Sequence, residues 1–428
     1  MIVTRFFDFL NKIDKFPYYF IAPCPYAIGT ASYDLMYGYF FSQYKNKKII
    51  VLLPFVFPNF LKYNICNKTL FKDLFFGKKL NLIESFYQFF SNLFFNIEFF
   101  IVRSFVIFND NFLKVKLNEY IRFLRVGNNF LLKKNILELN HYKNIIKNIN
   151  INNYNVLIKD NINIKCKNIL LKNKFIFEKY VCIHTRDESY RNDYNRRIYR
   201  NSSVDNFIDA IKYLINQGFG VVRLGDNKSK KTSITNKSFL DYPFTDLKSE
   251  EMDIYLLKNC FFFIGTNSGP LDTARLFGKP TLIHNMINPL SDGYPLRYFD
   301  RGYLKKIEYK NEELSLLEFL KLPFKFHNPC SNISELKFIE CDAYENYINI
   351  KEYCELIKDD KISYTKLQKN FNIFFKENIK NFFKNEFFQK KNESLLFDHN
   401  AKKIIFSLEK SSGTLTDNYL NKNYYEEN

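Results

Sequence analysis

The chain has 428 residues, of which 46% are hydrophobic, so it is long and apolar enough to bury two domain cores. Its net charge of +18 indicates an anionic partner: an acidic substrate, a phospholipid surface or nucleic acid. Its eight cysteines are scattered, with no Cys-x-x-Cys pair and no dense framework, which indicates reduced, mostly buried thiols in a cytosolic protein.

A βαβ pattern opens the chain. Residues 18–22 read as a strand, residues 31–41 as a helix and residues 48–53 as a second buried strand. The loop between the first strand and the helix contains Gly29, at the carboxyl end of the strand. This pattern predicts a parallel strand pair with a glycine turn.

Two apolar segments in the first half of the chain could be mistaken for a signal peptide or a membrane-spanning helix. Residues 1–16 are interrupted by Asp8, Lys12 and Asp14, so we expect no signal peptide. Residues 86–108 are long enough to span a bilayer, but four polar or charged residues interrupt them: Asn92, Asn96, Glu98 and Arg103. A buried or interfacial helix is expected there.

The middle of the chain gives a weak signal for structure. Residues 141–175 are rich in Asn, Lys and Ile without a helical period, which is typical of short strands or a linker. We place a domain boundary near their end. The expected division is therefore an N-terminal domain (1–172), a C-terminal domain (173–330) and a helical C-terminal extension (331–428).

A regular alternation of strands and helices follows this boundary and predicts a parallel sheet with right-handed crossovers. The expected strands are residues 180–184, 219–224, 261–264 and 281–284, and the expected helices are residues 204–217, 250–259 and 271–277. Ser203 and Ser249 are suited to cap two of these helices, while Gly218 and Gly278 are suited to end helices.

A glycine-bounded loop, residues 265–269 (Gly-Thr-Asn-Ser-Gly), joins a buried strand to a helix that begins with Pro270. Such a loop presents backbone N–H groups and the positive end of a helix dipole, which favours anions. A plain βα turn without a ligand is the alternative interpretation.

Arginine gathers beyond the strand ends, where open α/β sheets bind ligands. Arg186 follows the strand 180–184 and is expected to face the glycine-bounded loop, a geometry suited to a diphosphate. The next loop adds further arginines: Arg191, Arg196, Arg197 and Arg200. A solvated basic loop is the alternative.

For three ionisable residues, the sequence allows either a role in function or a purely structural role. His184 is either a packed, hydrogen-bonded histidine or a base. Asp253 either binds ribose hydroxyls or complements a helix dipole, and Asp34 is either a first-turn helix acid or a base facing the domain junction. The sequence has no Gly-Lys-Ser/Thr phosphate loop, no zinc-type spacing and no Asp-x-Asp pair, so no metal site is expected.

The block YVCIHTRDESY, YRNSSVDNFIDAIKYLINQGFGVVRLGD and MDIYLLKNCFFFIGTNSGPLDTARLFGKP, within residues 180–284, resembles a family of bacterial glycosyltransferases linked to surface polysaccharides. The tail GTLTDNYLNKNY resembles the same family more weakly. His-x-Arg after a strand is similar to the nucleotide-diphosphate motif of fucosyltransferases, and NSGPLDTA is similar to the donor loop of heptosyltransferases. The resemblance implies an α/β fold of two Rossmann-like domains facing a cleft (the GT-B architecture), with the nucleotide-sugar bound by the C-terminal domain.

Residue patterns and resemblance together imply a glycosyltransferase, a hexosyl- or related transferase, that needs no metal or other cofactor. It would move a sugar from a nucleotide-sugar donor to a glycan or lipid-linked acceptor in surface polysaccharide synthesis. The expected catalytic residues are Asp34 and His184. The expected donor-binding residues are Arg186, Arg200, Asn201, Asp226, Asp253, Thr266, Asn267, Ser268 and Gly269, with Gly29 in the acceptor-side loop.

No nucleic-acid partner is expected, and the expected location is the cytoplasm, at the inner face of the cytoplasmic membrane. Four apolar residues near the N-terminus favour peripheral contact with an anionic membrane: Phe6, Phe7, Phe9 and Leu10. A sugar-nucleotide epimerase on the same fold is an alternative that needs an acid/base pair and no acceptor. A basic, non-catalytic RNA-binding protein is another, but it would interleave aromatic and basic residues on one face, whereas arginine here gathers at strand ends.

Overall fold

The protein is described from a computed structural model of the chain. The residues that it describes are 6–7, 9–10, 13–23, 27–52, 65–72, 74–76, 81–115, 150, 154, 156–187, 198–287, 296–321, 336–358, 362–384 and 409–424.

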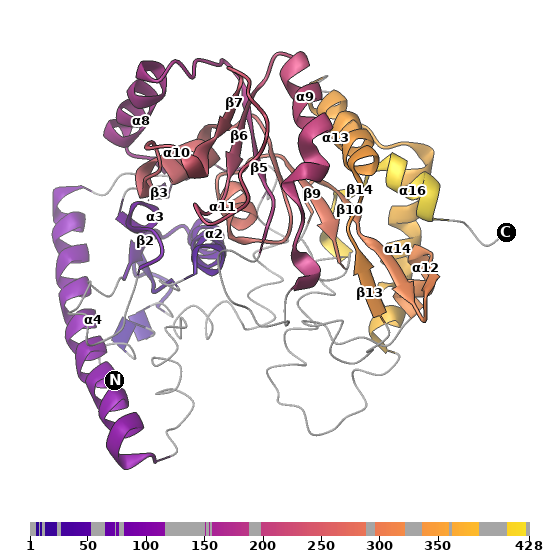
Figure 1. Cartoon of the computed structure of the whole chain (residues 1–428). Coiled ribbons are helices and arrows are strands. Elements are labelled where there is room, and N and C mark those ends of the chain that lie inside the picture. Colours follow the sequence, from indigo (N-terminus) through magenta and orange to yellow (C-terminus); the bar gives the residue numbers. More distant parts are fainter. Residues whose placement is uncertain are drawn as a thin grey trace.

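A parallel sheet forms the centre of the described structure (Figure 1). Its seven strands lie in the order β14-β10-β9-β8-β5-β6-β7, and every neighbouring pair is parallel. The strands are β5 (Tyr180–His184), β6 (Gly220–Leu224), β7 (Phe239–Asp241), β8 (Phe263–Gly265), β9 (Thr281–Met286), β10 (Arg301–Leu304) and β14 (Thr414–Leu415). The predicted α/β class with a parallel sheet is confirmed.

Helices cover both faces of this sheet. On one face α9 (Ile208–Asn216) and α13 (Ala343–Lys358) pack on side chains such as Val181 and Ile183. On the other face α10 (Glu250–Asn259) and α11 (Gly269–Leu276) pack on the alternate side chains, such as Cys182. Alternate residues of β5 therefore serve two different cores, which is why the strand reads as a continuous apolar run.

The predicted cap of α10 is confirmed, because the Ser249 side chain accepts a hydrogen bond from the Met252 amide. The Ser203 side chain accepts one from the Asp205 amide, but it caps a 3-10 turn, Val204–Phe207, that leads into α9. Gly218 and Gly278 follow α9 and α11 with φ angles of 85° and 71°, a left-handed conformation that glycine adopts without strain.

The N-terminal part contains the predicted βαβ unit. Strands β1 (Tyr18–Ile21) and β2 (Lys48–Val51) are parallel and are joined by α2 (Ile28–Tyr44). Gly29 lies in the first turn of α2, so the expected glycine loop is part of the helix. Helix α2 packs closely on α11, where the Ser32 and Thr273 hydroxyls are 2.8 Å apart.

Four further elements surround this unit. They are α3 (Lys68–Lys72), the antiparallel pair β3 (Leu74–Phe76) and β4 (Val156–Ile158), and α8 (Asp160–Lys172). A long helix, α4 (Leu82–Phe108), runs along the outside of the molecule and continues as a π-helical turn, Asn109–Leu113 (Figure 1). In the part of the chain that is described, no helix combines the length and apolarity needed to cross a membrane.

The described part of the chain after residue 331 contains both helices and strands. It holds α14 (Lys366–Lys384) and α16 (Asp417–Asn423), and its β14 extends the main sheet by pairing with β10. A small antiparallel sheet has the strand order β12-β11-β13. Its strands are β11 (Lys306–Tyr309), β12 (Glu312–Glu313) and β13 (Leu336–Ile339), and α12 (Leu316–Lys321) lies between β12 and β13 in the chain. One hydrophobic cluster joins residues of α2, the main sheet and α14, so the three expected regions share a core.

Candidate active site

A cavity of about 470 Å³ lies beyond the carboxyl ends of β5, β6 and β8, between the first turns of α2 and α11. Nine of the twelve predicted site residues line it: Gly29, His184, Arg186, Arg200, Asp226, Asp253, Asn267, Ser268 and Gly269. This is the edge of the sheet at which α/β folds bind ligands.

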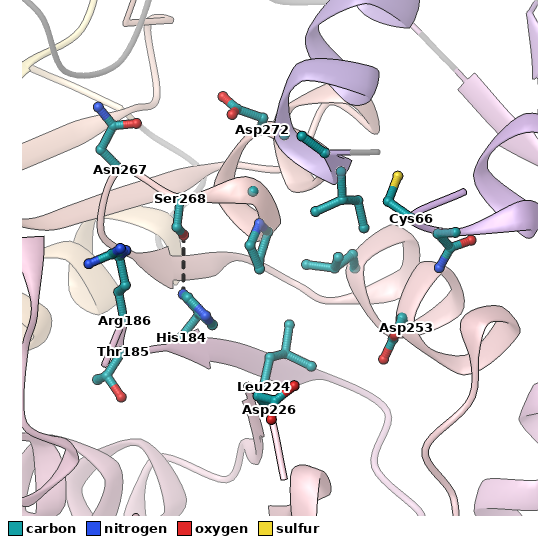
Figure 2. A pocket seen from close by; sticks show the side chains of 18 of the residues that line it. Cys66, His184, Thr185, Arg186, Leu224, Asp226, Asp253, Asn267, Ser268 and Asp272 are labelled. Carbon is teal, nitrogen blue, oxygen red and sulfur yellow. Dashed lines mark hydrogen bonds between the residues drawn. The ribbon is translucent and has the colours of Figure 1, made fainter. Parts of the chain in front are cut away.

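Arg186 occupies one side of the cavity, close to Asn267 in the view of Figure 2. A guanidinium nitrogen of Arg186 donates to the Asn201 carboxamide oxygen, and the Arg186 carbonyl accepts from the Ser202 amide at 2.8 Å. Asn201 does not itself line the cavity, but it orients the arginine that does. The two contacts also hold together the two ends of the loop that leads from β5 toward α9.

Arg200 adds a second cation to the lining. Its Nε is buried and has no hydrogen-bond partner within the described parts of the chain. A buried guanidinium nitrogen without an acceptor is costly, and an anion in the cavity would satisfy it. Arg191, Arg196 and Arg197 lie outside the described residues.

His184 and Ser268 connect the end of β5 to the start of α11. The His184 Nδ1 and the Ser268 Oγ are 3.1 Å apart (Figure 2). The His184 carbonyl oxygen is 3.0 Å from Nε2 of His284. Burial lowers the pKa of His184 to about 4, and nearby Arg223 and Arg186 contribute to this. The imidazole is therefore neutral at physiological pH and is suited to orient Ser268 rather than to accept a proton.

Asp253 lies on the opposite side of the cavity from Arg186, near Cys66 (Figure 2). Its carboxylate accepts a hydrogen bond from the Tyr242 hydroxyl at 2.8 Å. Burial raises the pKa of Asp253, while Lys248 and the bond from Tyr242 oppose this rise. The carboxylate is thereby fixed in place with acceptor capacity left for a ligand hydroxyl.

Asp272, which the sequence interpretation did not select, also lines the cavity, in the first turn of α11. It is half-buried, and desolvation raises the pKa of its carboxyl to about 7, although Arg275 and Arg200 act in the opposite direction. A carboxyl that titrates near neutral pH is suited to general acid–base chemistry. Its position three residues after Gly269 can be read from the sequence, but its contact with Gly29 of α2, far away along the chain, cannot.

Three predicted residues lie away from the lining. Asp34 is buried within α2, with 8% of its surface exposed, and Thr266 is buried below the loop. Asn201 acts through Arg186, as described above. Asp226 does line the cavity, but its carboxylate also accepts from the Lys228 amide at 3.0 Å, in its own turn.

The two helix N-termini meet at the cavity through glycine. A Cβ on Gly269 would lie 2.5 Å from the Ile28 Cγ2 atom and 3.1 Å from the Gly29 amide nitrogen. A Cβ on Gly29 would lie 2.9 Å from the Gly269 Cα and 2.7 Å from an Asp272 carboxylate oxygen. These glycines therefore allow backbones to approach each other and bring Asp272 against α2.

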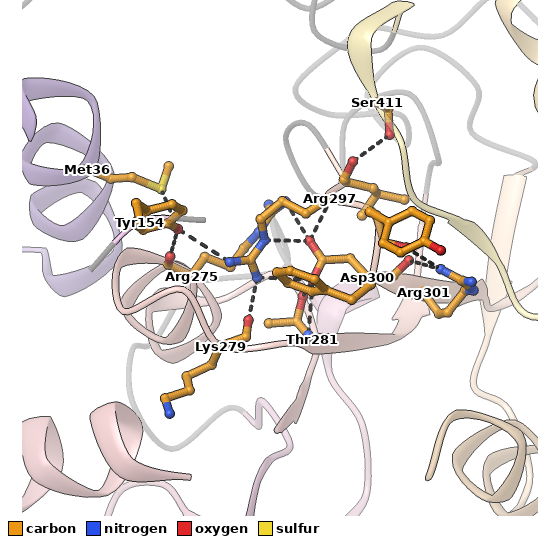
Figure 3. A network of polar contacts seen from close by, with 12 residues as sticks. Met36, Tyr154, Arg275, Lys279, Thr281, Arg297, Asp300, Arg301 and Ser411 are labelled. Atoms are coloured by element: carbon orange, nitrogen blue, oxygen red, sulfur yellow. Dashed lines mark hydrogen bonds and ion pairs between the residues drawn. The ribbon is translucent and has the colours of Figure 1, made fainter. Parts of the chain in front are cut away.

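A buried ion network anchors the far end of α11 (Figure 3). Asp300 accepts hydrogen bonds from Arg297 Nε at 2.9 Å and from the Thr281 hydroxyl at 2.8 Å, and it pairs with Arg275 at 3.4 Å. The Tyr154 hydroxyl donates to the Arg275 carbonyl oxygen at the C-terminal end of α11. The network thus connects α11 to the main sheet and to the segment before β4.

Other lining residues add polar groups that the sequence interpretation did not include: Thr185, Asp187, Ser229, Lys248 and Asn67. Lys248 donates to the Gly225 carbonyl oxygen at 2.6 Å, so its charge is held at the edge of the cavity. Within the described ranges, no three His, Cys, Asp or Glu side chains gather in an arrangement that could hold a metal ion.

No protein-family model and no curated protein matches the chain. Among solved structures, a glycosyl transferase family 9 protein from Veillonella parvula is similar, with 10% sequence identity and a TM-score of 0.34. The similarity covers 66% of this chain and 82% of that chain. A TM-score this low does not establish a shared fold.

Proposed function

We propose that the protein is a glycosyltransferase that moves a sugar from a nucleotide-sugar donor to an acceptor hydroxyl. The observation that carries the proposal is the meeting, in one cavity, of Arg186, Arg200 and Asp272. Two guanidinium groups suit a diphosphate, and a carboxyl with a pKa near 7 suits the activation of a hydroxyl.

The donor diphosphate would lie between the arginines and the first turn of α11. Arg186, oriented by Asn201, would bind two phosphate oxygens, and the buried Nε of Arg200 would find its acceptor there. The amides of residues 267–269 and the dipole of α11 add positive potential. Asp253, across the cavity, would accept hydrogen bonds from the ribose hydroxyls.

In the reaction, Asp272 would take the proton of the acceptor hydroxyl while its oxygen attacks the anomeric carbon. The bond from that carbon to the donor phosphate breaks, and the nucleoside diphosphate leaves with the electron pair. Arginine charge and the helix N-terminus stabilise the leaving diphosphate. A single displacement of this kind inverts the anomeric configuration, and Asp272 replaces the earlier candidate Asp34 as the base because Asp34 does not line the cavity.

The acceptor is proposed to be a glycan or a lipid-linked sugar in the synthesis of a surface polysaccharide. This part rests on the sequence resemblance of residues 180–284. Because arginine and the helix dipole neutralise the diphosphate, transfer is proposed to proceed without a bound metal ion.

A ligand screen followed by product analysis tests the proposal. A nucleotide-sugar at a hundred times its dissociation constant stabilises a protein by about 2.7 kcal/mol, which a thermal shift detects. The best ligand is then incubated with candidate acceptors, and release of nucleoside diphosphate together with a glycosylated product is expected. No stabilisation by any nucleotide-sugar or nucleoside diphosphate would contradict the proposal, while isomerisation of the donor without an acceptor would favour the epimerase.

A further inference from the structure

Helix α4 exposes an almost wholly apolar surface. Of its side chains that are described, every exposed one is apolar except Ser85. The set is Leu82, Ile83, Phe86, Phe89, Phe90, Leu93, Phe94, Ile97, Phe100, Ile101, Phe105 and Phe108, and we call it the α4 face. Its members recur every three or four residues, so they form a continuous stripe along the helix.

Four polar residues of α4 point the opposite way, into the protein. Glu84, Ser91, Asn96 and Glu98 are all buried. Glu84 pairs with Lys48 of β2, and the Asn92 side chain donates to the Val51 carbonyl oxygen at 3.1 Å. The outer face of the helix is therefore apolar and its inner face is mixed, because Phe95, Phe99 and Val102 are buried there as well. Both acids of the helix, Glu84 and Glu98, lie on the inner face.

The N-terminal segment packs beside this helix and extends its apolar surface. Phe7 and Leu10 are buried in a small cluster with Phe95 of α4, which leaves Phe6 and Phe9 exposed. Of the four N-terminal residues predicted to contact a membrane, two therefore face outward and two hold the segment on α4. Figure 1 shows α4 on the outer edge of the molecule, with the N-terminus next to it.

An apolar surface of this length exceeds what a protein leaves in water without a partner. Two occupants suit it: a second copy of the chain or a lipid bilayer. Two copies that each carry a net charge of +18 repel one another, whereas an anionic bilayer attracts the same charge. The α4 face itself carries no described acidic side chain that would oppose such an approach.

We infer that the protein docks on the surface of an anionic lipid bilayer through the α4 face, with Phe6 and Phe9 at its edge. The helix lies in the plane of the interface and inserts its phenylalanines among the acyl chains. Glu84 stays paired with Lys48 and Glu98 stays buried against the protein, so the helix rests on the bilayer and does not cross it. This inference does not depend on the chemistry in the cavity.

A fluorescence experiment tests the inference at one position, because the natural chain contains no tryptophan. Phe94→Trp places a single reporter on the α4 face, and Ile373→Trp places a matched one on α14, since the two parent side chains are 53% and 57% exposed. With vesicles of phosphatidylcholine and phosphatidylglycerol, we expect a blue shift and quenching by brominated acyl chains for Phe94→Trp alone. Absence of a shift at Phe94, or equal shifts at both positions, would overturn the inference.

Removal of apolar surface gives a second test. The double variant Phe86→Ser/Ile101→Ser is expected to lower vesicle partitioning roughly a hundredfold, since each apolar side chain inserted into the bilayer contributes about a factor of ten. The control Ile373→Ser should leave partitioning unchanged, and both variants should bind nucleoside diphosphate as the wild type does. If α4 joins two copies instead, the wild type is a dimer that ignores vesicles and the double variant is a monomer, which also overturns the inference.

Discussion

At the scale of single residues, Arg186 gives the most direct test of the diphosphate site. Its planar guanidinium is oriented by Asn201 and can bind two phosphate oxygens at once, which the point charge of a lysine cannot reproduce. For Arg186→Lys we expect binding of nucleoside diphosphate to weaken by roughly 2–5 kcal/mol, with little change in the melting temperature of the free protein. Calorimetric titration measures the affinity.

The control for this change is Lys212→Gln, which alters an exposed ion pair with Asp209 on α9. It should leave nucleotide affinity unchanged. Equal affinities of wild type and Arg186→Lys would remove Arg186 from the diphosphate site.

Asp272 is expected to control the pH dependence of transfer. Its carboxyl has a pKa of about 7 in the folded protein because of burial, so as a base it works only above that pH. We expect kcat/KM to rise with pH up to about 7 and then to level off, and Asp272→Asn to lower it by about 10²–10⁴-fold while nucleotide binding is kept. His184 cannot account for such a step, because its pKa is about 4.

The same carboxyl predicts a stability signature that is independent of activity. Folding raises the pKa of Asp272, so between about pH 4 and pH 7 the carboxyl is protonated in the folded protein but ionised in the unfolded chain. The free energy of unfolding therefore falls as pH rises through this window. Asp272→Asn has no titrating group at this position and so lacks this loss of stability. The melting temperature of the variant relative to wild type should therefore increase from pH 5 to pH 8, and a constant difference would contradict the raised pKa.

At the scale of elements, the contact between α2 and α11 decides the shape of the cavity. Gly29→Ala would place a Cβ 2.9 Å from the Gly269 Cα, where only a backbone shift can relieve the clash. We expect a loss of about 1–3 kcal/mol in the free energy of unfolding, together with lower transfer activity. Denaturant unfolding and initial rates measure the two effects.

Gly38→Ala in the same helix is the matched control. Its Cβ would lie 2.9 Å from the Ile21 Cδ1 atom and 3.1 Å from its Cγ2 atom, so it meets a side chain away from the cavity and no backbone atom. This variant should lose less stability than Gly29→Ala and keep its activity. Similar losses from the two substitutions would show that the backbone contact at the cavity has no special role.

The elements of the main sheet could be predicted because each has a local signal. Apolar runs bounded by Gly, Ser or Pro placed β5, β6, β8 and β9 within a few residues, and Ser203, Ser249, Gly218 and Gly278 were identified as caps and stops from residue type alone. These signals are local because capping bonds and left-handed φ angles involve only near neighbours in the chain.

Helix α8 was not predicted, because the composition of its segment obscures its helical pattern. Its stripe of Ile162, Cys166 and Leu170 has helical spacing, but the Asn and Lys residues around it resemble a linker in composition. The start of α2 was also misplaced, because Gly29 reads as a turn when its role is contact with a helix 240 residues away along the chain. Contacts of that range leave no local pattern, so nothing local in the sequence favours Asp272 over Asp34 as the candidate base, although only Asp272 lines the cavity.

At the scale of the whole molecule, Asp300 connects parts of the chain that are far apart in sequence. It is completely buried and bonded to Arg297 and Thr281, and it pairs with Arg275, whose carbonyl accepts from Tyr154. Burial alone would raise the pKa of Asp300, but the charges of Arg297 and Arg275 and the hydrogen bonds from Arg297 hold it below its usual value. The carboxylate is therefore charged in the folded protein, and two buried arginines depend on it.

Asp300→Asn is expected to lower the free energy of unfolding by about 3–5 kcal/mol at pH 7, because it leaves buried arginine charge uncompensated. Asp209→Asn, at an exposed pair with Lys212, should cost less than about 1 kcal/mol. Since folding lowers the pKa of Asp300, its contribution is complete above the pKa of an unfolded aspartate, about 3.9, and is lost as pH falls further. Denaturant unfolding of wild type and Asp300→Asn should therefore converge below pH 4, and a difference that is small or the same at every pH would mean that the ion network does not hold α11 to the sheet.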